Sequence, residues 1–109
     1  MSNAFIPDEA VSWEAADASI QRKVMAFNEQ LMLVKVKFRK GDIGSLHHHI
    51  HTQISYVASG VFEVEINDKK SILQTGDVFY VSPETIHGVV CLEEGILIDV
   101  FNPMRADFV

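Results

Sequence analysis

The stretch of sequence that decides the fold reads Gly41-Asp42-Ile43-Gly44-Ser45-Leu46-His47-His48-His49-Ile50-His51-Thr52-Gln53-Ile54-Ser55-Tyr56-Val57-Ala58-Ser59-Gly60. It holds four of the five histidines of the chain, and the fifth, His87, follows in Pro83-Glu84-Thr85-Ile86-His87. Successive side chains of an extended strand point to opposite faces, so His47, His49 and His51 are expected on one face and His48 on the other. Imidazole binds zinc-, nickel-, iron- and manganese-type ions, and the pattern therefore predicts a site for one divalent metal ion.

A purification tag or a solvated turn would also cluster histidines, but both fit this chain less well. A tag would lie at a terminus, whereas these histidines lie in mid-chain between runs that resemble strands. A solvated polar turn is less favourable, because crowding three imidazoles on one face without a bonding partner costs free energy.

Apolar and polar residues alternate along most of the remaining chain. Alternation over 31–40 predicts a half-buried strand, joined to a strand at 20–27 by the turn Asn28-Glu29-Gln30. Further short strands, separated by turns such as Ser59-Gly60 and Glu93-Glu94-Gly95, are expected at 54–58, 61–66, 71–74, 78–81, 86–92 and 96–101. No long stretch has helical periodicity, so the sequence predicts an all-β domain, either a closed antiparallel barrel or a double-sheet jelly roll.

Length and composition limit the classes of protein that remain. With 109 residues, 48 % of them hydrophobic, the chain can form one domain with its own core. It has neither the apolar run of a membrane span nor a start typical of a secretory signal, so a cytoplasmic protein is expected. The single cysteine, Cys91, is expected to be a small buried residue. A net charge of −6 with scattered Lys and Arg argues against nucleic-acid binding, and an anionic substrate must be attracted by a metal or a positioned Arg.

Spacing around the histidines resembles the two sequence motifs of the cupin family. The first motif is matched by Gly41, His47-x-His49, Gln53 and Gly60. The second motif is matched by Gly76-Asp77, Pro83 and His87. The chain departs from the pattern where Gln53 replaces the usual Glu, where the interval from Pro83 to His87 is one residue short, and where Cys91 replaces a common Asn. The resemblance implies a single-domain cupin barrel, a double-stranded β-helix, in which one divalent ion is held by His47, His49, Gln53 and His87.

A neutral Gln53 in this shell has a chemical consequence. Three imidazoles and an amide leave the double charge of the ion uncompensated, which favours Lewis-acid chemistry on an anionic substrate over oxygen activation by iron. The identity of the metal, whether nickel, zinc, iron or manganese, stays open.

The C-terminal stretch carries a more specific resemblance. The chain is similar here to the small pectin- and alginate-catabolism cupins that linearise 4,5-unsaturated monouronates. The similarity lies in Pro103-Met104-Arg105-Ala106-Asp107-Phe108, together with Arg22-Lys23-Val24-Met25 and His51-Thr52-Gln53. This resemblance implies an isomerase-type enzyme with a small anionic sugar substrate. It also implies a homodimer that exchanges N-terminal strands, with residues 1–19 as an arm and residues 20–109 as the barrel with its tail.

The same resemblance assigns roles to four further side chains. Asp99 would be the general acid and base, Arg105 a clamp on the substrate, and Phe101 an apolar wall of the catalytic site. His51 would contact the substrate or support the metal ligands, or else lie on a polar rim. The alternatives are that Asp99 bonds a turn, and that Arg105 pairs with Asp107 or Glu94.

Several neighbouring residues are given structural roles. Trp13 is expected to be a packing anchor, and Arg22 and Lys23 are expected on a solvated strand face more than at the barrel mouth. Two other functions remain open at this point: a different metal-dependent cupin enzyme, such as a dioxygenase or an epimerase, and a non-catalytic cupin that binds a sugar or a metal.

Overall fold

Two long antiparallel strands, β5 (Thr52–Ile66) and β8 (His87–Asn102), form the centre of the fold. The structure is a computed structural model and describes residues 4–109. The two strands pair from Thr52 opposite Asn102 to Ile66 opposite His87. The other elements are the 3-10 turn η1 (Asp8–Ala10), β1 (Glu14–Asp17), β2 (Ile20–Asn28), β3 (Leu31–Phe38), β4 (Ile43–His47), β6 (Lys69–Gln74), β7 (Val78–Val81) and the 3-10 turn η2 (Ala106–Phe108).

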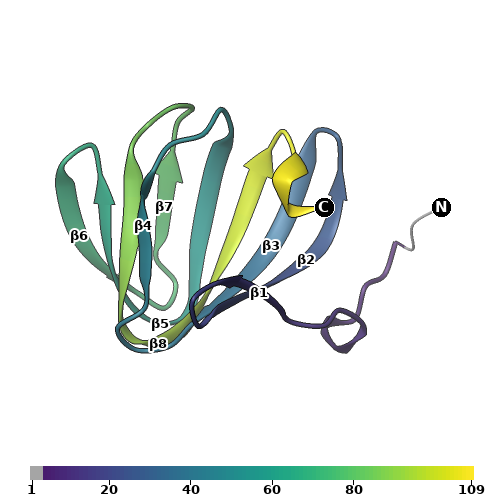
Figure 1. The fold of residues 1–109 in the computed structure, drawn as a ribbon, viewed down its shortest axis with the longest axis horizontal. Helices are drawn as coiled ribbons and strands as arrows, with labels where there is room; N and C mark the ends of the chain where they lie inside the picture. Colours follow the sequence, from purple (N-terminus) through teal and green to yellow (C-terminus); the bar gives the residue numbers. More distant parts are fainter. Residues whose placement is uncertain (1–3) are drawn as a thin grey trace.

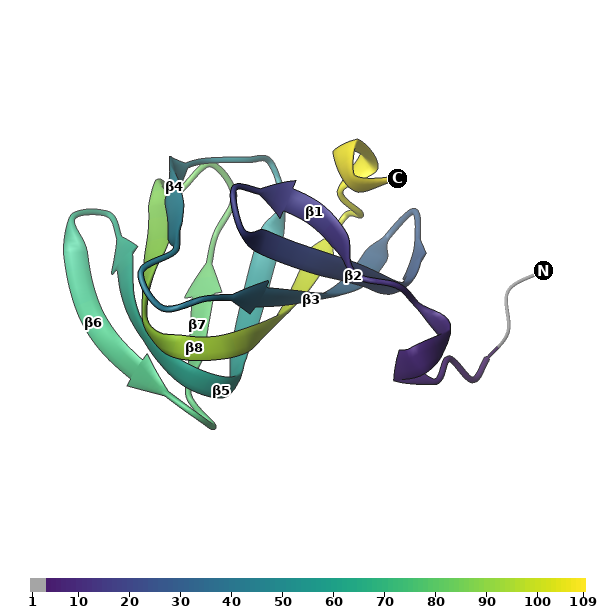
Figure 2. The ribbon, with the colours of Figure 1, turned by 60° about the horizontal axis from the view of Figure 1, so that its bottom comes forward.

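Both long strands bend, so that each contributes to two walls of a barrel (Figures 1 and 2). The first wall contains β1, β2, β3, the second half of β8, the first half of β5, and β7. The second wall contains β4, the first half of β8, the second half of β5, and β6. The prediction of an all-β, single-domain barrel is therefore confirmed. Among residues 4–109 no helix is long and apolar enough to span a membrane.

Glycines make the bend possible. Gly60 has a φ of 86°, and a Cβ added there would lie 2.6 Å from the carbonyl oxygen of Glu93. A Cβ added at Gly95 would overlap the carbonyl oxygen of Ser59. The expectation that strands end at Ser59-Gly60 and at Glu93-Glu94-Gly95 was wrong, because the register shifts there while the pairing of β5 with β8 continues.

The remaining strand predictions differ mainly at their ends. β2 and β3 flank the expected turn, where the Asn28 side-chain oxygen accepts hydrogen bonds from the backbone of Gln30 and Leu31. β6 begins earlier than expected, because Asn67 and Asp68 alone form the turn, with φ of 49° and 66°. β4 was not expected as a separate strand.

The space between the walls is filled by apolar side chains. Phe62 and Phe38 meet edge to face with ring centroids 5.2 Å apart, and Cys91 is 1 % exposed, as predicted. Outside the barrel, Trp13 packs under the ammonium groups of Lys23 and Lys37, in agreement with its expected role as an anchor. Within the expected arm, β1 pairs with β2 of its own chain, and residues 1–3 lie outside the described residues. Strand exchange between two chains stays a prediction.

Candidate active site

Pairing of β4 with β8 brings two histidines together. His47 is the last residue of β4 and His87 the first of β8, and the two are direct partners in the sheet. Their ring centroids lie 4.3 Å apart. The strands approach closely because Gly88 has no side chain: a Cβ there would lie 2.8 Å from the carbonyl oxygen of Gly44.

A backbone contact between two loops places the third imidazole. The amide of Glu84 donates to the carbonyl oxygen of His49 over 2.7 Å, which ties the loop after β4 to the loop before β8. The His49 ring centroid lies 5.5 Å from that of His47 and 4.9 Å from that of His87. Nitrogen atoms of these three rings lie within 4.8 Å of one another, so the cluster can hold a metal ion.

Strand alternation was the wrong reason for expecting His47, His49 and His51 together. Of these three, only His47 belongs to a strand, and residues 48–51 form a loop that turns the rings toward each other. His48 points away, as predicted, and its Nδ1 lies 3.1 Å from a carboxylate oxygen of Glu84.

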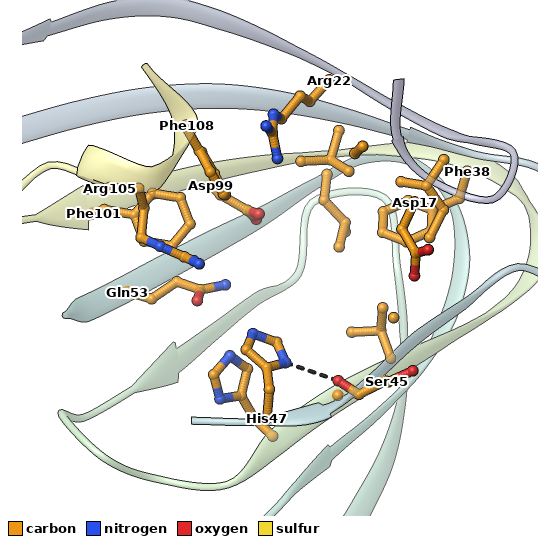
Figure 3. Close-up of a pocket in the computed structure, with 18 of the residues that line it drawn as sticks. Asp17, Arg22, Phe38, Ser45, His47, Gln53, Asp99, Phe101, Arg105 and Phe108 are labelled. Atoms are coloured by element: carbon orange, nitrogen blue, oxygen red, sulfur yellow. Dashed lines mark hydrogen bonds between the residues drawn. The ribbon is translucent and has the colours of Figure 1, made fainter. Parts of the chain in front are cut away.

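The hydrogen bonds of the cluster leave nitrogen lone pairs available. A carbonyl oxygen only accepts, so His47 Nδ1–H donates to Ser45 over 2.8 Å (Figure 3), and His87 Nδ1–H donates to Thr85 over 2.8 Å. Each Nε2 therefore keeps its lone pair, and that of His87 is buried without a hydrogen-bond partner among residues 4–109. Burial lowers the pKa of His87 to about 4 and also lowers the pKa of His49. Neutral imidazole is the form that binds metals, so the donor set fits a divalent ion.

A chain of hydrogen bonds leads from this cluster to Asp99. The buried Gln53 places Oε1 3.0 Å from His49 Nε2, and its Nε2–H donates to Ser55 Oγ over 2.9 Å. Ser55 Oγ–H donates in turn to Asp99 Oδ1 over 2.6 Å. Burial raises the pKa of Asp99 to about 6, although Ser55 and Arg105 oppose the shift. Asp99 thus bonds a side chain on the neighbouring strand, and the alternative of a turn contact is wrong.

His47, His87, Gln53 and Asp99 line a cavity of about 330 Å³ inside the barrel. Figure 3 shows the guanidinium groups of Arg22 and Arg105 pointing into it, with His47 across the cavity from them. The lining also includes Asp17, Ile20, Val36, Phe38, Gln53, His87, Leu97, Asp99, Phe101 and Phe108. The cavity therefore has an apolar wall, the partly buried carboxyl group of Asp99 and two cations beside the histidine cluster.

The C-terminal tail forms one side of the cavity. The guanidinium of Arg105 lies 5.1 Å from the ring centroid of Phe101 and 4.4 Å from that of Phe108. Arg105 also forms an ion pair with Asp107 over 3.0 Å, which was one of the alternatives predicted for it, and it still lines the cavity. The guanidinium of Arg22 lies 4.0 Å from the Phe108 centroid.

His51 holds this tail in place. It is 8 % exposed, so the expectation of a polar rim is wrong. Its Nε2–H donates to the carbonyl oxygen of Met104 over 3.1 Å, and its ring lies 5.1 Å from that of His49. His51 is therefore placed to support both the cluster and the tail.

Sequence reasoning missed two residues here. Ser55 shares the inward face of β5 with Gln53 and Val57, a period of two that was visible in the sequence. Arg22 and Lys23 were expected on a solvated face, but Lys23 is 5 % exposed and Arg22 lines the cavity, where its guanidinium contacts Phe108 from the other end of the chain. No local pattern reports such a contact.

Comparisons with known proteins agree with this architecture. A family model described as a cupin domain matches residues 34–101. The pectin degradation protein KdgF of Dickeya dadantii (strain 3937) is 51 % identical over 110 residues, covering 99 % of each chain. The crystal structure of an RmlC-like cupin from Shewanella frigidimarina NCIMB 400 superposes with a TM-score of 0.96 at 42 % identity, over 99 % of this chain and 97 % of that one. KdgF from Halomonas sp. superposes with a TM-score of 0.95 at 40 % identity, over 99 % and 100 %.

Metal binding by the cluster is tested by removing two of its imidazoles. The double variant His47→Ala/His87→Ala is expected to lose the ion, because one imidazole and an amide hold a divalent ion poorly. His48→Ala is the matched control and should keep the metal content of the parent. Elemental analysis of dialysed protein measures the ratio of metal to chain. A folded double variant that retains the parental ratio would show that the ion binds elsewhere.

Proposed function

This chain belongs to the cupin family, together with the pectin degradation protein KdgF, and we propose that it opens the ring of 4,5-unsaturated monouronates from pectin or alginate breakdown. The product is the linear 5-keto-4-deoxyuronate. The observation that carries the proposal is the partly buried Asp99, joined by hydrogen bonds to a histidine cluster that can hold a metal and facing the same cavity as two arginines.

The reaction is an isomerisation that moves one proton. Removing the proton from the anomeric hydroxyl lets the C1–O5 bond break, which leaves an aldehyde at C1 and an enolate whose oxygen is O5. Delivery of a proton to C4 converts the enolate to a ketone, so atoms and electrons balance without an oxidant. Each step needs a group that accepts or gives a proton near neutral pH.

Asp99 is suited to carry that proton. A carboxyl group with a pKa of about 6 is ionised enough to accept a proton at neutral pH and acidic enough to return it. Ser55 fixes one carboxyl oxygen of Asp99, so the other oxygen is left for the substrate. Phe101 is placed to serve as an apolar wall that limits water near the reacting carbons.

The charges around the cavity suit an anionic sugar. His47, His49, His87 and Gln53 are the residues that would hold the ion, and a divalent cation there supplies Lewis-acid stabilisation of developing negative charge. Arg105 and Arg22 add positive charge at the cavity in a chain whose net charge is −6. We assign Arg105 to the substrate carboxylate or a hydroxyl, with its pairing to Asp107 fixing the guanidinium.

The same donor set disfavours the other functions. Oxygen-activating iron sites commonly contain a carboxylate, whereas position 53 supplies a neutral amide. A binding protein without catalysis has no use for a carboxyl group at the cavity whose pKa is raised. These observations favour the isomerase.

An exposed apolar surface supports the expected homodimer. On the outer face of β5 and β7, Ile54 lies opposite Tyr80 and Tyr56 opposite Val78. All four side chains are between 43 % and 58 % exposed. Monomeric proteins rarely expose a large contiguous apolar patch, and a second copy of this chain would cover it.

The activity itself is tested by ultraviolet absorbance. Purified protein mixed with an unsaturated monouronate is expected to abolish the absorbance of the C4=C5 enol ether, with the linear ketone appearing by NMR. Treatment with a chelator should slow the reaction, and added divalent metal should restore it. An unchanged absorbance with metal-loaded protein would refute the proposed function.

Replacement of Asp99 tests its role as proton carrier. Asp99→Asn is expected to lower turnover by about 10² to 10⁴ while keeping the metal. The ionised carboxylate is the form that accepts the proton, so parental kcat/KM should rise with pH through a midpoint at or below about 6, since a bound cation lowers the pKa further. The variant should lack this dependence. A parental rate in a folded, metal-loaded variant would exclude Asp99 as the catalyst.

The dimer surface is tested by placing charge on it. Ile54→Lys/Tyr80→Lys is expected to turn a dimer into a monomer in sedimentation velocity, because two buried ammonium groups would oppose association. Ile43→Lys, an exposed position on β4, is the control and should leave the parental state. A monomeric parent protein, or a dimeric double variant, would contradict this assignment.

A further inference from the structure

One buried hydroxyl stands between the proposed metal site and the proposed catalytic acid. Ser55 is 0 % exposed and lies directly opposite Asp99 in the pairing of β5 with β8. Its Oγ is 2.6 Å from Asp99 Oδ1 and 2.9 Å from Gln53 Nε2. The sequence motifs of the two histidine segments assign no role to this position.

The number of hydrogens on each group decides the direction of the hydrogen bonds that join Gln53, Ser55 and Asp99. A hydroxyl carries one hydrogen, and an ionised carboxylate only accepts, so Ser55 must donate to Asp99. The separation of 2.6 Å is typical of an O–H···O⁻ bond. Ser55 then has only lone pairs left for Gln53, so the NH₂ of the Gln53 amide must face Ser55. Its carbonyl oxygen is consequently turned the other way, toward His49.

We propose that Ser55 is a positioning residue, which uses its bond to Asp99 to aim the carbonyl oxygen of Gln53 at the histidine cluster. An amide can present either oxygen or NH₂ to a metal, and only the oxygen is a ligand. This inference rests on the metal site of the proposed function and adds a cause for its amide orientation.

The same arrangement accounts for Gln53 at a position where the cupin motif usually has Glu. A carboxylate in its place would present an oxygen to Ser55 Oγ, whose one hydrogen is already donated to Asp99. The carboxylates at positions 53 and 99 would then compete for the one hydrogen of the buried Ser55 hydroxyl. One carboxylate oxygen would face a lone pair of Ser55 Oγ without a hydrogen between them, which is unfavourable. A carboxylate at position 99 therefore requires an amide at position 53.

Zinc affinity tests the positioning role. Ser55→Ala is expected to weaken Zn²⁺ binding at least tenfold in competition with a chromophoric chelator, as losses of groups that orient metal ligands commonly do. Ser59→Ala is the matched control: it lies on the same strand, and its hydroxyl accepts a bond from the Ile96 amide. Its zinc affinity should equal that of the parent. Parental affinity in folded Ser55→Ala would overturn the proposal, whereas a parent that binds no zinc would contradict the metal site itself.

A double-mutant cycle tests the hydrogen count without relying on activity. Gln53→Glu should lower the midpoint of urea unfolding, because two carboxylates then face one hydroxyl hydrogen. In the Asp99→Asn background the new amide can donate to Ser55, which frees the hydroxyl hydrogen for the carboxylate at position 53. Gln53→Glu is therefore expected to raise the unfolding equilibrium constant at least tenfold less in the Asp99→Asn background than in the parent. All four proteins are measured with the same excess of Zn²⁺. Additive effects of the two substitutions would overturn the proposal.

Discussion

The close passage of two backbones, at Gly60 in β5 and Gly95 in β8, is the constraint on which the rest of the molecule depends. With a side chain at either position, the added Cβ would overlap a carbonyl oxygen of the opposite strand. Because both strands bend there without separating, each supplies residues to two walls. The bend lets β4 and β7 pair with strands that also carry Gln53, Asp99 and His87, so the cavity and its polar groups follow from it.

Burial gives these polar groups their chemistry. Desolvation disfavours the charged form, and it acts in opposite directions on the two kinds of group: it lowers the pKa of His87 and raises that of Asp99. The imidazole consequently stays neutral and able to bind a cation, while the carboxyl group titrates close to neutral pH. One apolar barrel would thus prepare both the ligand set and the proton carrier that we propose, and Ser55 lies between them, bonded to Gln53 and to Asp99.

The sequence identified which residues gather at this site better than it predicted how they are brought together. His47, His49 and His87 were found through family spacing, and they converge, but through a loop contact made by Glu84 in place of strand alternation. Gly60 was interpreted as a strand break because glycine commonly marks a turn, whereas here it permits a bend inside one strand. Arg22 could not be placed, since its position depends on Phe108, which is distant in sequence. Period-two patterns report which face a residue occupies, and they carry no information on how distant segments meet.

The uneven exposure of the three imidazoles bears on how the ion comes and goes. His87 is buried and His49 partly so, but His47 stands at the surface at the end of β4. An ion held only by buried ligands is trapped until the protein opens, whereas a surface ligand can be displaced by an incoming chelator one bond at a time. We therefore expect a metal ion bound at this centre to exchange readily, and since geometry and availability outweigh raw affinity in metal selection, its identity should follow the metals that the cell supplies.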